Sequence, residues 1–163
     1  MTDTFQAQLD SPVGVLTLVA SDEGLRKILW EDQAEQAGDA TVAASHPVLA
    51  AASAQLTEYF AGDRAEFDLP LDLIGTDFQK AAWLALADVP YGETRSYGEQ
   101  AECIGRTGAF RAVGAANGKN PIPIVLPCHR IVGADGSLTG FAGGLEMKQR
   151  LLALEQAQQS FDI

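Results

Sequence analysis

Hydrophobic and polar residues alternate in the first part of the chain. Residues 5–10 alternate strictly, residues 11–14 (Ser-Pro-Val-Gly) have the composition of a turn, and residues 15–19 form a second, mostly apolar run. Another turn at residues 22–24 precedes a third run at residues 25–30. A period of two between Gly- and Pro-containing turns is typical of half-buried strands. The pattern predicts a hairpin followed by a third strand.

A helix is predicted after these strands. Residues 31–45 are acidic, rich in Ala and aperiodic, which favours a loop. Pro47 suits the first position of a helix and Gly62 its end. Apolar residues recur between them at helical spacing, at Leu49, Ala52, Leu56 and Phe60. Residues 66–73 are expected to be extended, and we place a domain boundary near residue 75.

From residue 76 the pattern becomes helical. Two capping boxes, Thr76 with Gln79 and Ser96 with Glu99, predict the N-termini of two helices. The first of these helices carries an apolar stripe formed by Phe78, Ala82, Leu86 and Val89. A Gly-containing turn follows the second helix, and Thr107 can cap a third. Two short helices joined by such a turn are the signature of a helix-turn-helix unit.

The third predicted helix is rich in small residues, namely Gly108, Ala109, Ala112, Gly114, Ala115 and Ala116. Gly lowers helix stability by about 0.5–1 kcal/mol relative to Ala. A helix of this composition therefore indicates close approach of another backbone. That backbone belongs either to a neighbouring helix or to a nucleic acid, and the sequence leaves both open.

The stretch after this helix leads to a cysteine. Residues 119–127 are expected to form a loop and an apolar strand, and Cys128, His129 and Arg130 follow. His129 supplies a base and Arg130 a cation, and either can favour the thiolate by lowering the pKa of Cys128. We therefore predict a presented nucleophile. The alternative is an inert core cysteine beside a surface His-Arg pair.

The last predicted helix, residues 145–158, carries a carboxylate on its apolar face. Lys148, Leu151, Leu152 and Glu155 share that face at helical spacing. A carboxylate on a buried face needs a charged or hydrogen-bonding partner. The alternative is an ordinary surface Glu at the margin of the apolar stripe.

Composition limits the class of protein. The chain has 163 residues, of which 47% are hydrophobic and 20% charged, as expected for folded domains that need no disulfides. Its N-terminus lacks the basic and apolar regions of a signal peptide, and no apolar run approaches the roughly 18 residues of a membrane span. Two Cys and two His do not make a recognisable zinc site. We expect no metal, no membrane association and a reducing, cytoplasmic environment.

The net charge of −11 argues against binding to nucleic acid, but the distribution of the charges along the chain does not. Residues 1–88 carry four Lys/Arg against fifteen Asp/Glu, whereas residues 89–150 carry seven against five. Residues 105–134 contain no acidic residue, and their basic residues are Arg106, Arg111, Lys119 and Arg130. This segment is compatible with an anion-binding face. A solvated basic face is the alternative.

Several motifs, in unbroken order, resemble the O6-alkylguanine-DNA alkyltransferase family. The most specific is residues 120–132, Asn-Pro-Ile-Pro-Ile-Val-Leu-Pro-Cys-His-Arg-Ile-Val. Others lie at residues 76–83, 90–98, 111–118, 138–144 and 151–155. The resemblance implies an α+β fold. A ribonuclease-H-like, strand-rich domain is expected over residues 1–75, and a winged helix-turn-helix domain that binds DNA and accepts the alkyl group over residues 76–163.

The resemblance also implies a stoichiometric DNA repair reaction that uses no cofactor. A damaged guanine is flipped out of the duplex, and the Cys128 thiolate takes the alkyl group from O6 and keeps it, so each molecule acts once. His129 is expected to relay the thiol proton and Glu155 to orient His129. Asn120 is expected to organise this network, and Tyr97 to donate a hydrogen bond to the leaving base. O6-methylguanine is the expected substrate, with O4-methylthymine as a second.

The partner implied by the resemblance is double-stranded DNA containing O6-alkylguanine, bound by a monomer through the minor groove. Arg111 is expected to fill the space of the extruded base. The other expected DNA contacts are Ala109, Ala112, Gly114, Lys119 and Arg130. The expected pocket residues are Pro123, Ile131, Phe141 and Ala142. Because residues 1–75 hold no Cys/His cluster, the structural zinc of some family members is not expected.

Three other functions compete with this one. A non-catalytic relative would bind alkylated bases without reacting, and the presence of Cys128 argues against it. A transcription regulator needs side chains that read base edges, and the small residues of the third helix offer few. A Cys-His hydrolase would turn over repeatedly instead of stopping after one event.

Overall fold

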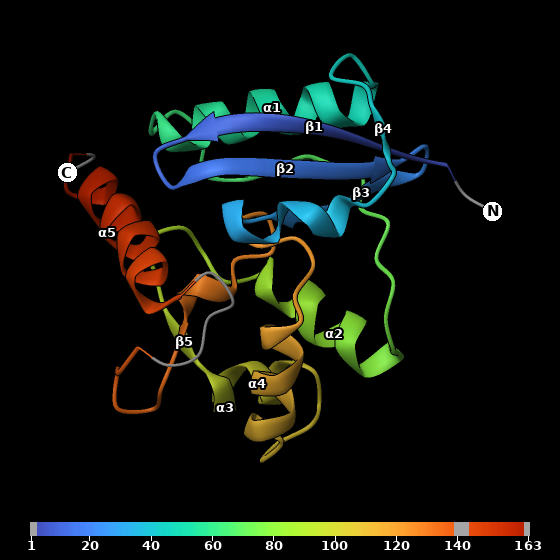
Figure 1. The fold of residues 1–163 in the computed structure, drawn as a ribbon. Helices are drawn as coiled ribbons and strands as arrows, with labels where there is room; N and C mark the ends of the chain where they lie inside the picture. Colours follow the sequence, from blue (N-terminus) through green and yellow to red (C-terminus); the bar gives the residue numbers. More distant parts are fainter. Residues whose placement is uncertain (1–2, 139–143, 162–163) are drawn as a thin grey trace. The chain divides into compact units, whose positions relative to one another are not determined.

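The computed structural model describes residues 3–138 and 144–161 of the chain (Figure 1). The chain forms two compact units, Met1–Ile74 and Gly75–Ile163, and each is described by itself. In the described ranges, no helix has the length and apolar character needed to cross a membrane.

The first unit is built on a four-stranded sheet in the order β3-β2-β1-β4 (Figure 1). β1 (Thr4–Ser11) and β2 (Gly14–Ser21) pair antiparallel through the predicted turn. β3 (Gly24–Leu29) pairs antiparallel with β2. The hairpin and the third strand are therefore confirmed.

The segment predicted as a loop contains two short elements. A 3-10 helix, η1, spans Glu31–Ala37, and β4 (Thr41–Val42) pairs parallel with β1. The expectation of a loop over residues 31–45 is wrong in this respect. A two-residue strand forms through pairing with a segment far away in the chain, so local composition does not signal it.

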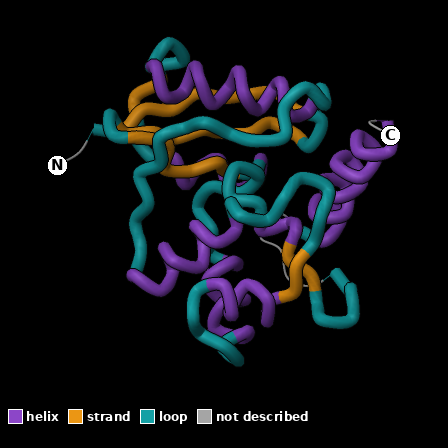
Figure 2. Tube along the Cα trace, turned by 180° about the vertical axis from the view of Figure 1, so that it is seen from behind, coloured by secondary structure: helices purple, strands orange, loops and turns teal. Residues whose placement is uncertain are grey.

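Helix α1 (Pro47–Phe60) lies along one face of this sheet (Figures 1 and 2). Its buried residues are Leu49, Ala52, Leu56 and Tyr59. Three of the four predicted positions are confirmed, and Tyr59 takes the place expected for Phe60. The imidazole of His46 accepts a hydrogen bond from the Val48 amide at 3.3 Å and caps the N-terminus.

An extended segment at residues 70–72 runs beside β3. The Leu25 amide donates to the Pro70 carbonyl at 2.8 Å, and the Asp72 amide donates to the Leu25 carbonyl at 2.9 Å. A Cβ atom on Gly24 would lie 2.8 Å from backbone atoms of Pro70 and Leu71, so this approach requires glycine. The extended segment predicted from the sequence is confirmed here.

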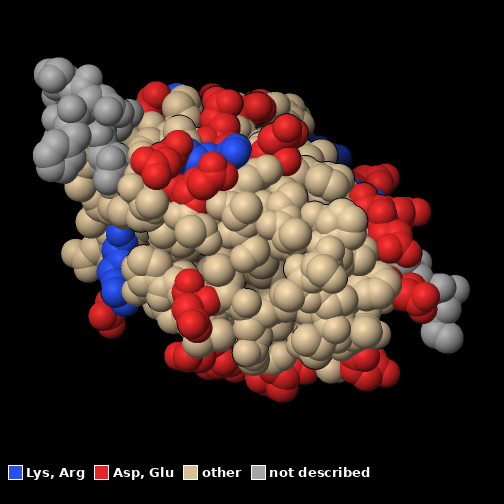
Figure 3. Space-filling view, turned by 90° about the horizontal axis from the view of Figure 1, so that it is seen from above, with Lys and Arg blue, Asp and Glu red and all other residues tan. Residues whose placement is uncertain are grey.

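Acidic side chains outnumber basic ones on the face drawn in Figure 3. The Asp and Glu residues gather mainly around the rim of this view, and uncharged residues fill its centre. The chain as a whole has 22 Asp and Glu residues against 11 Lys and Arg residues.

The second unit is a winged helix-turn-helix arrangement. Its helices are α2 (Asp77–Leu86), α3 (Tyr97–Cys103), α4 (Phe110–Gly118) and α5 (Leu145–Phe161). The short strands β5 (Arg95–Ser96) and β6 (Ile131–Val132) pair parallel, and a 3-10 turn, η2 (Cys128–Arg130), directly precedes β6. Helices α3 and α4 with their turn form the predicted helix-turn-helix unit.

Local side-chain chemistry sets two of these helix starts. The Thr76 hydroxyl accepts from the Gln79 amide at 3.1 Å, and Ser96 accepts from the Glu99 amide at 3.1 Å, so both capping boxes are confirmed. Thr107 does not cap α4, because the chain turns at Gly108, where φ is +88°, and the helix begins two residues later.

Helix α4 uses its small residues on two sides. On the inner side, the Trp83 indole donates to the Ala116 carbonyl at 2.7 Å, and the Gln100 and Asn117 amides exchange hydrogen bonds of 2.9 and 2.8 Å. The outer residues Ala112, Ala115 and Gly118 are exposed. Packing against neighbouring helices therefore explains the small residue at 116 and leaves the outer ones unexplained.

Candidate functional site

Cys128 lies at the end of a tightly turned loop. The apolar strand predicted within residues 119–127 is absent, because the Leu126 amide donates back to the Ile122 carbonyl at 2.9 Å. The Asn120 side chain holds this turn at both ends, donating to the Leu126 carbonyl at 2.8 Å and accepting from the Ile122 amide at 3.0 Å. The predicted role of Asn120 as an organiser is consistent with these two bonds.

The same loop contains one strained residue. Ile124 is buried and has φ of +75°, in the left-handed region that β-branched residues rarely adopt. Such a conformation is unfavourable by about 1–3 kcal/mol and persists only where the surrounding structure enforces it. The loop that carries Cys128 is therefore held in place by its contacts.

A buried ionic network lies next to the cysteine in the sequence. His129 Nε2 is 2.6 Å from Glu155 Oε2. The Arg130 guanidinium donates to both oxygens of Glu155, at 2.8 and 3.0 Å, and to the Val89 carbonyl at 2.7 Å. All three charged or titratable side chains are buried. The network supplies the partners that a carboxylate on the apolar face of α5 requires.

Glu155 is ionised at neutral pH. Burial raises the pKa of this carboxyl group, but the hydrogen bonds from His129 and Arg130 and the positive charge of Arg130 outweigh it. The pKa falls to about 2. The carboxylate can therefore only accept hydrogen bonds, which fixes the role of its neighbours.

His129 is a neutral base. Its complete burial lowers its pKa, and the opposing effect of Glu155 does not restore it. Because Glu155 only accepts, we assign the imidazole proton to Nε2, which leaves the lone pair on Nδ1. Nδ1 is buried and has no hydrogen-bond partner within residues 3–138 and 144–161. The site thus holds an oriented base with its accepting atom unused.

The thiol of Cys128 differs from the expectation. Its neighbours were expected to lower its pKa, yet burial raises that pKa to about 11, against the smaller lowering effects of Asn120 and Lys148. Cys128 is only 7% exposed, so desolvation disfavours the thiolate. The expectation of a lowered pKa is therefore wrong, and at neutral pH Cys128 is a protonated thiol.

Lys148 belongs to this site and was missed as a functional residue. Its side chain is fully buried, and its ammonium lies 5.9 Å from the centroid of the Tyr97 ring. Burial lowers the pKa of Lys148, and its positive charge in turn favours the Cys128 thiolate. The sequence did offer a signal for this residue, because Lys148 is a cationic residue on the apolar face of the predicted last helix.

Arg130 is not placed to bind DNA. It is 5% exposed, and its guanidinium donates to Glu155 and to a backbone carbonyl. The prediction that Arg130 contacts DNA is therefore wrong: its guanidinium faces the protein interior. A sequence cannot tell whether an arginine next to a buried cysteine faces solvent or the protein interior.

The other residues predicted to contact DNA lie on or beside α4. Arg111, Ala112 and Lys119 are exposed, and Ala109 is partly exposed as the N-cap. Gly114 faces Tyr97, because a Cβ atom there would lie 3.7 Å from that ring. Of these residues, Arg111, Ala112 and Lys119 are therefore on the exposed side of this segment, and Gly114 is on a side that faces the protein.

Of the predicted pocket residues, Pro123 and Ile131 are buried in the segment around Cys128. Phe141 and Ala142 lie outside the described residues. In the described ranges, no group of three or more His, Cys, Asp or Glu side chains could hold a metal ion.

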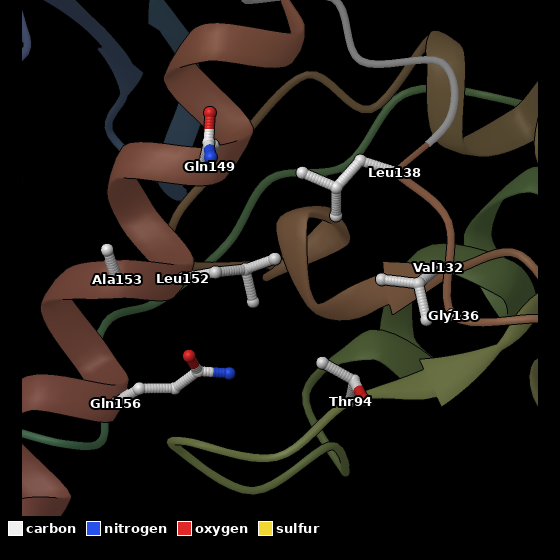
Figure 4. A pocket seen from close by; sticks show the side chains of 8 residues that line it. All are labelled: Thr94, Val132, Gly136, Leu138, Gln149, Leu152, Ala153 and Gln156. Atoms are coloured by element: carbon white, nitrogen blue, oxygen red, sulfur yellow. The ribbon is translucent and has the colours of Figure 1, made fainter.

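A separate open cavity of about 400 Å³ lies between α5 and the β5–β6 region (Figure 4). Its lining consists of Thr94, Val132, Gly136, Leu138, Gln149, Leu152, Ala153 and Gln156. Figure 4 shows the Leu152 side chain extending from α5 towards the side where Leu138 and Val132 lie. None of the predicted catalytic residues lines this cavity.

Two family models match the chain. Residues 5–73 match the ribonuclease-like domain of 6-O-methylguanine DNA methyltransferase, and residues 77–157 match its DNA binding domain. Together the two matches cover most of both units.

Curated and solved proteins give the same result. The chain is 53% identical to a methylated-DNA–protein-cysteine methyltransferase of Mycolicibacterium paratuberculosis, over 91% of this chain and 90% of that protein. It is 46% identical to the protein of the same name from Methanosarcina acetivorans, over 93% and 97% of the two chains. The crystal structure of Mycobacterium tuberculosis OGT in complex with DNA superposes with a TM-score of 0.85 at 47% identity, covering 96% of this chain and 94% of that one.

Proposed function

The chain belongs to the 6-O-methylguanine DNA methyltransferase family, and we propose that it repairs O6-methylguanine in double-stranded DNA by moving the methyl group to Cys128. O4-methylthymine is the proposed second substrate. One observation carries the assignment of the site. His129, the residue after the buried Cys128, is paired with the buried Glu155 and leaves its own Nδ1 atom without a hydrogen bond in the described residues. We place the reaction in the cytoplasm, in a monomer.

The proposed reaction begins with extrusion of the damaged base, because its methyl group cannot be reached within the stack. His129 Nδ1 takes the thiol proton, directly or through a water, and the Cys128 sulfur attacks the methyl carbon. A C–S bond forms as the C–O6 bond breaks, and its electron pair goes to guanine. Tyr97 donates a proton or hydrogen bond to the base as this charge develops. The thioether is stable, so one molecule repairs one lesion.

Glu155 and Arg130 are proposed as positioning residues in this reaction. Glu155 holds the Nε2–H tautomer of His129 and stabilises the imidazolium that forms when Nδ1 takes the proton. The two hydrogen bonds from Arg130 keep Glu155 ionised and fix the plane of its carboxylate. Arg130 thus acts on the chemistry through Glu155.

A raised pKa at Cys128 suits a protein that reacts once. At pH about 7, a thiol with a pKa of about 11 is ionised in roughly one molecule in ten thousand. The resting sulfur is therefore protected from other electrophiles and oxidants, whose targets are thiolates. Proton transfer to His129 restricts the reactive form to the moment of transfer.

The exposed surface of α4 is the proposed DNA contact. Small residues such as Ala112 and Ala115 allow two backbones to approach, and Arg111 can occupy the space of the extruded base. Lys119 adds a positive charge for the phosphates. Minor-groove contact of this kind requires no base-specific reading, which suits repair in any sequence context.

The proposal is tested by substitution of the two cysteines. Cys128→Ala should abolish methyl transfer from a duplex with one O6-methylguanine while leaving duplex affinity within about threefold, since the side chain is buried. Cys103→Ala is the matched control, because Cys103 is an exposed thiol of the same unit, and it should transfer normally. Transfer at the wild-type rate in Cys128→Ala, measured with a radiolabelled methyl group, contradicts the assignment.

A further inference from the structure

An aromatic side chain stands exposed at the first position of α4. Phe110 is 50% exposed, although its ring is among the largest apolar groups available to the protein. Exposed single apolar residues are common, so exposure alone does not indicate a function. The surroundings of Phe110 supply the additional observations.

Phe110 lies on the side of α4 that leads to the reactive centre. Gly114 follows Phe110 by four residues, and residues four apart lie above one another on a helix, about one turn or roughly 6 Å along the axis. Gly114 in turn faces the Tyr97 ring, and the Lys148 ammonium lies 5.9 Å from that ring. Phe110 is therefore about one helical turn from the position on α4 that faces Tyr97, the residue proposed to donate to the leaving base.

The environment of Phe110 is cationic. The Arg111 guanidinium lies 5.9 Å from the centroid of the Phe110 ring, so the two side chains are neighbours. Residues 105–134 carry no Asp or Glu, and Arg106 and Lys119 lie on either side of α4 in the sequence. DNA is a polyanion whose bases are stacked aromatic groups. An exposed ring beside an arginine, in a segment without acidic residues, is therefore complementary to DNA.

We propose that Phe110 is a second intruding side chain, which stacks on the base pair beside the extruded nucleotide while Arg111 occupies the vacated space. The inference rests on the proposed function, because it needs a flipped base. Extrusion exposes the face of the neighbouring base pair, and an aromatic ring can cover that face. Apolar wedges of this kind partly unstack a base step and kink the duplex.

Stacking by Phe110 fits a protein that repairs lesions in any context. Every base has a π-face, so a phenyl ring stacks without reading sequence. The ring also gains by leaving water, since half of its surface is exposed in the free protein. Arg111 alone would leave the face of the flanking base pair open to solvent.

The test compares three variants on two substrates. Phe110→Ala removes the ring, Phe110→Tyr retains it, and Leu84→Ala removes a 52% exposed apolar side chain from α2 as the matched control. The substrates are a duplex with one O6-methylguanine and a single-stranded oligonucleotide of the same sequence. A 2-aminopurine beside the lesion in the duplex reports unstacking through its fluorescence.

We expect Phe110→Ala to slow methyl transfer from the duplex about tenfold, in line with the loss of one aromatic stack. Transfer from the single strand should change by less than about threefold, because fewer stacking contacts oppose access to the base there. The 2-aminopurine signal should fall for Phe110→Ala and return for Phe110→Tyr. Leu84→Ala should match the wild type in all three measurements.

Three outcomes would contradict the proposal that Phe110 stacks on the flanking base pair. Phe110→Ala with wild-type duplex transfer and fluorescence shows that the ring is not used, and equal losses on duplex and single strand show damage to the site itself. If Phe110→Ala instead converts a wild-type dimer to monomer without DNA and leaves duplex transfer unchanged, the ring serves contact between copies. Failure of the proposed function is distinct, because the wild type would then transfer no methyl group from either substrate.

Discussion

In the proposed reaction Cys128 is the nucleophile and His129 the base, because the thiol alone is a weak nucleophile at neutral pH. Burial that raises the pKa of Cys128 to about 11 also lowers the pKa of His129, so the histidine is neutral and able to accept the proton. The ionised Glu155 fixes which nitrogen accepts. Burial of residues 128–129 therefore has two effects: it keeps the Cys128 thiol protonated, and it keeps His129 neutral and able to accept that proton.

Removal of this base should give a distinctive pH dependence. His129→Gln should lower transfer at about pH 7 by about 10²–10⁴-fold, the usual contribution of general acid-base catalysis. Its rate should then rise about tenfold per pH unit, because only the ionised thiol reacts and its pKa is about 11. The wild-type rate should change little between about pH 7 and 9. A parallel pH profile for the variant and the wild type, measured under single-turnover conditions, would remove the base role.

Arg130 gives a residue-level prediction for stability. Loss of one partner from a buried ion pair destabilises by about 3–5 kcal/mol, so Arg130→Met should lower the free energy of unfolding by that amount near pH 7. The exposed pair of Arg95 and Glu93, with 3.2 Å between its atoms, is the matched control, and Arg95→Met should change stability by less than about 1 kcal/mol.

The pH dependence of this loss follows from Glu155. Its pKa in the folded chain, about 2, lies below the ordinary value of 4.5. The carboxylate therefore stabilises the fold fully above pH about 4.5 and loses this effect as the pH falls towards 2. The difference between wild type and Arg130→Met, measured by urea unfolding, should shrink over that range. A difference that stays constant from about pH 7 to pH 3 contradicts the assigned charge state.

At the scale of elements, α4 has one side packed against the protein and another that is the proposed DNA contact. Its inner side is fixed by the Trp83 hydrogen bond to Ala116 and by the Gln100–Asn117 pair. This anchoring leaves the outer side exposed, with Arg111 on it. A helix with larger residues at its outer positions would hold a bound backbone at a distance.

Arg111, on the exposed side of α4, gives a prediction about the role of this helix. Arg111→Ala should slow repair of a lesion in a duplex by about tenfold or more and should slow reaction with free O6-benzylguanine by much less, since the free base needs no extrusion. Arg150→Ala, which removes the same charge from an exposed position on α5, serves as the control. Equal losses on both substrates would exclude a role of Arg111 in base flipping.

How far the sequence predicts these elements depends on how local their causes are. The starts of α2 and α3 could be predicted because Thr76 and Ser96 bond to amides three residues away. The start of α4 could not, since Gly108 with its positive φ delays the helix beyond Thr107. Equally, no local pattern announces the positive φ of Ile124, which the folded loop imposes.

The site shows the same division. Cys128, His129, Glu155 and Asn120 were identified from motif and spacing, and their contacts are consistent with the expected roles. The environment of each group was harder to predict. Whether Arg130 faces DNA or Glu155, and whether burial or charge decides the pKa of Cys128, depends on three-dimensional packing that spacing does not encode.

At the scale of the whole molecule, the distribution of charge matters more than its sum. Residues 1–88 have a net charge of −11. Residues 105–134 hold no acidic residue; of their four basic residues, Arg106, Arg111 and Lys119 are exposed, whereas Arg130 is buried against Glu155. Acidic surface elsewhere disfavours other anions and leaves the basic segment as the place where DNA meets least repulsion. A protein of low pI can bind DNA by this local arrangement.

Single-use methyl transfer to Cys128 is tested most directly by the intact mass of the protein after incubation with a short duplex that carries one O6-methylguanine. We expect a gain of one CH₂ unit, located on the peptide that contains Cys128, which saturates at one per molecule however much duplex is added. An unchanged mass with tight retention of the duplex would contradict methyl transfer and favour a binding protein. Demethylation of an excess of duplex over protein would contradict the single use of Cys128.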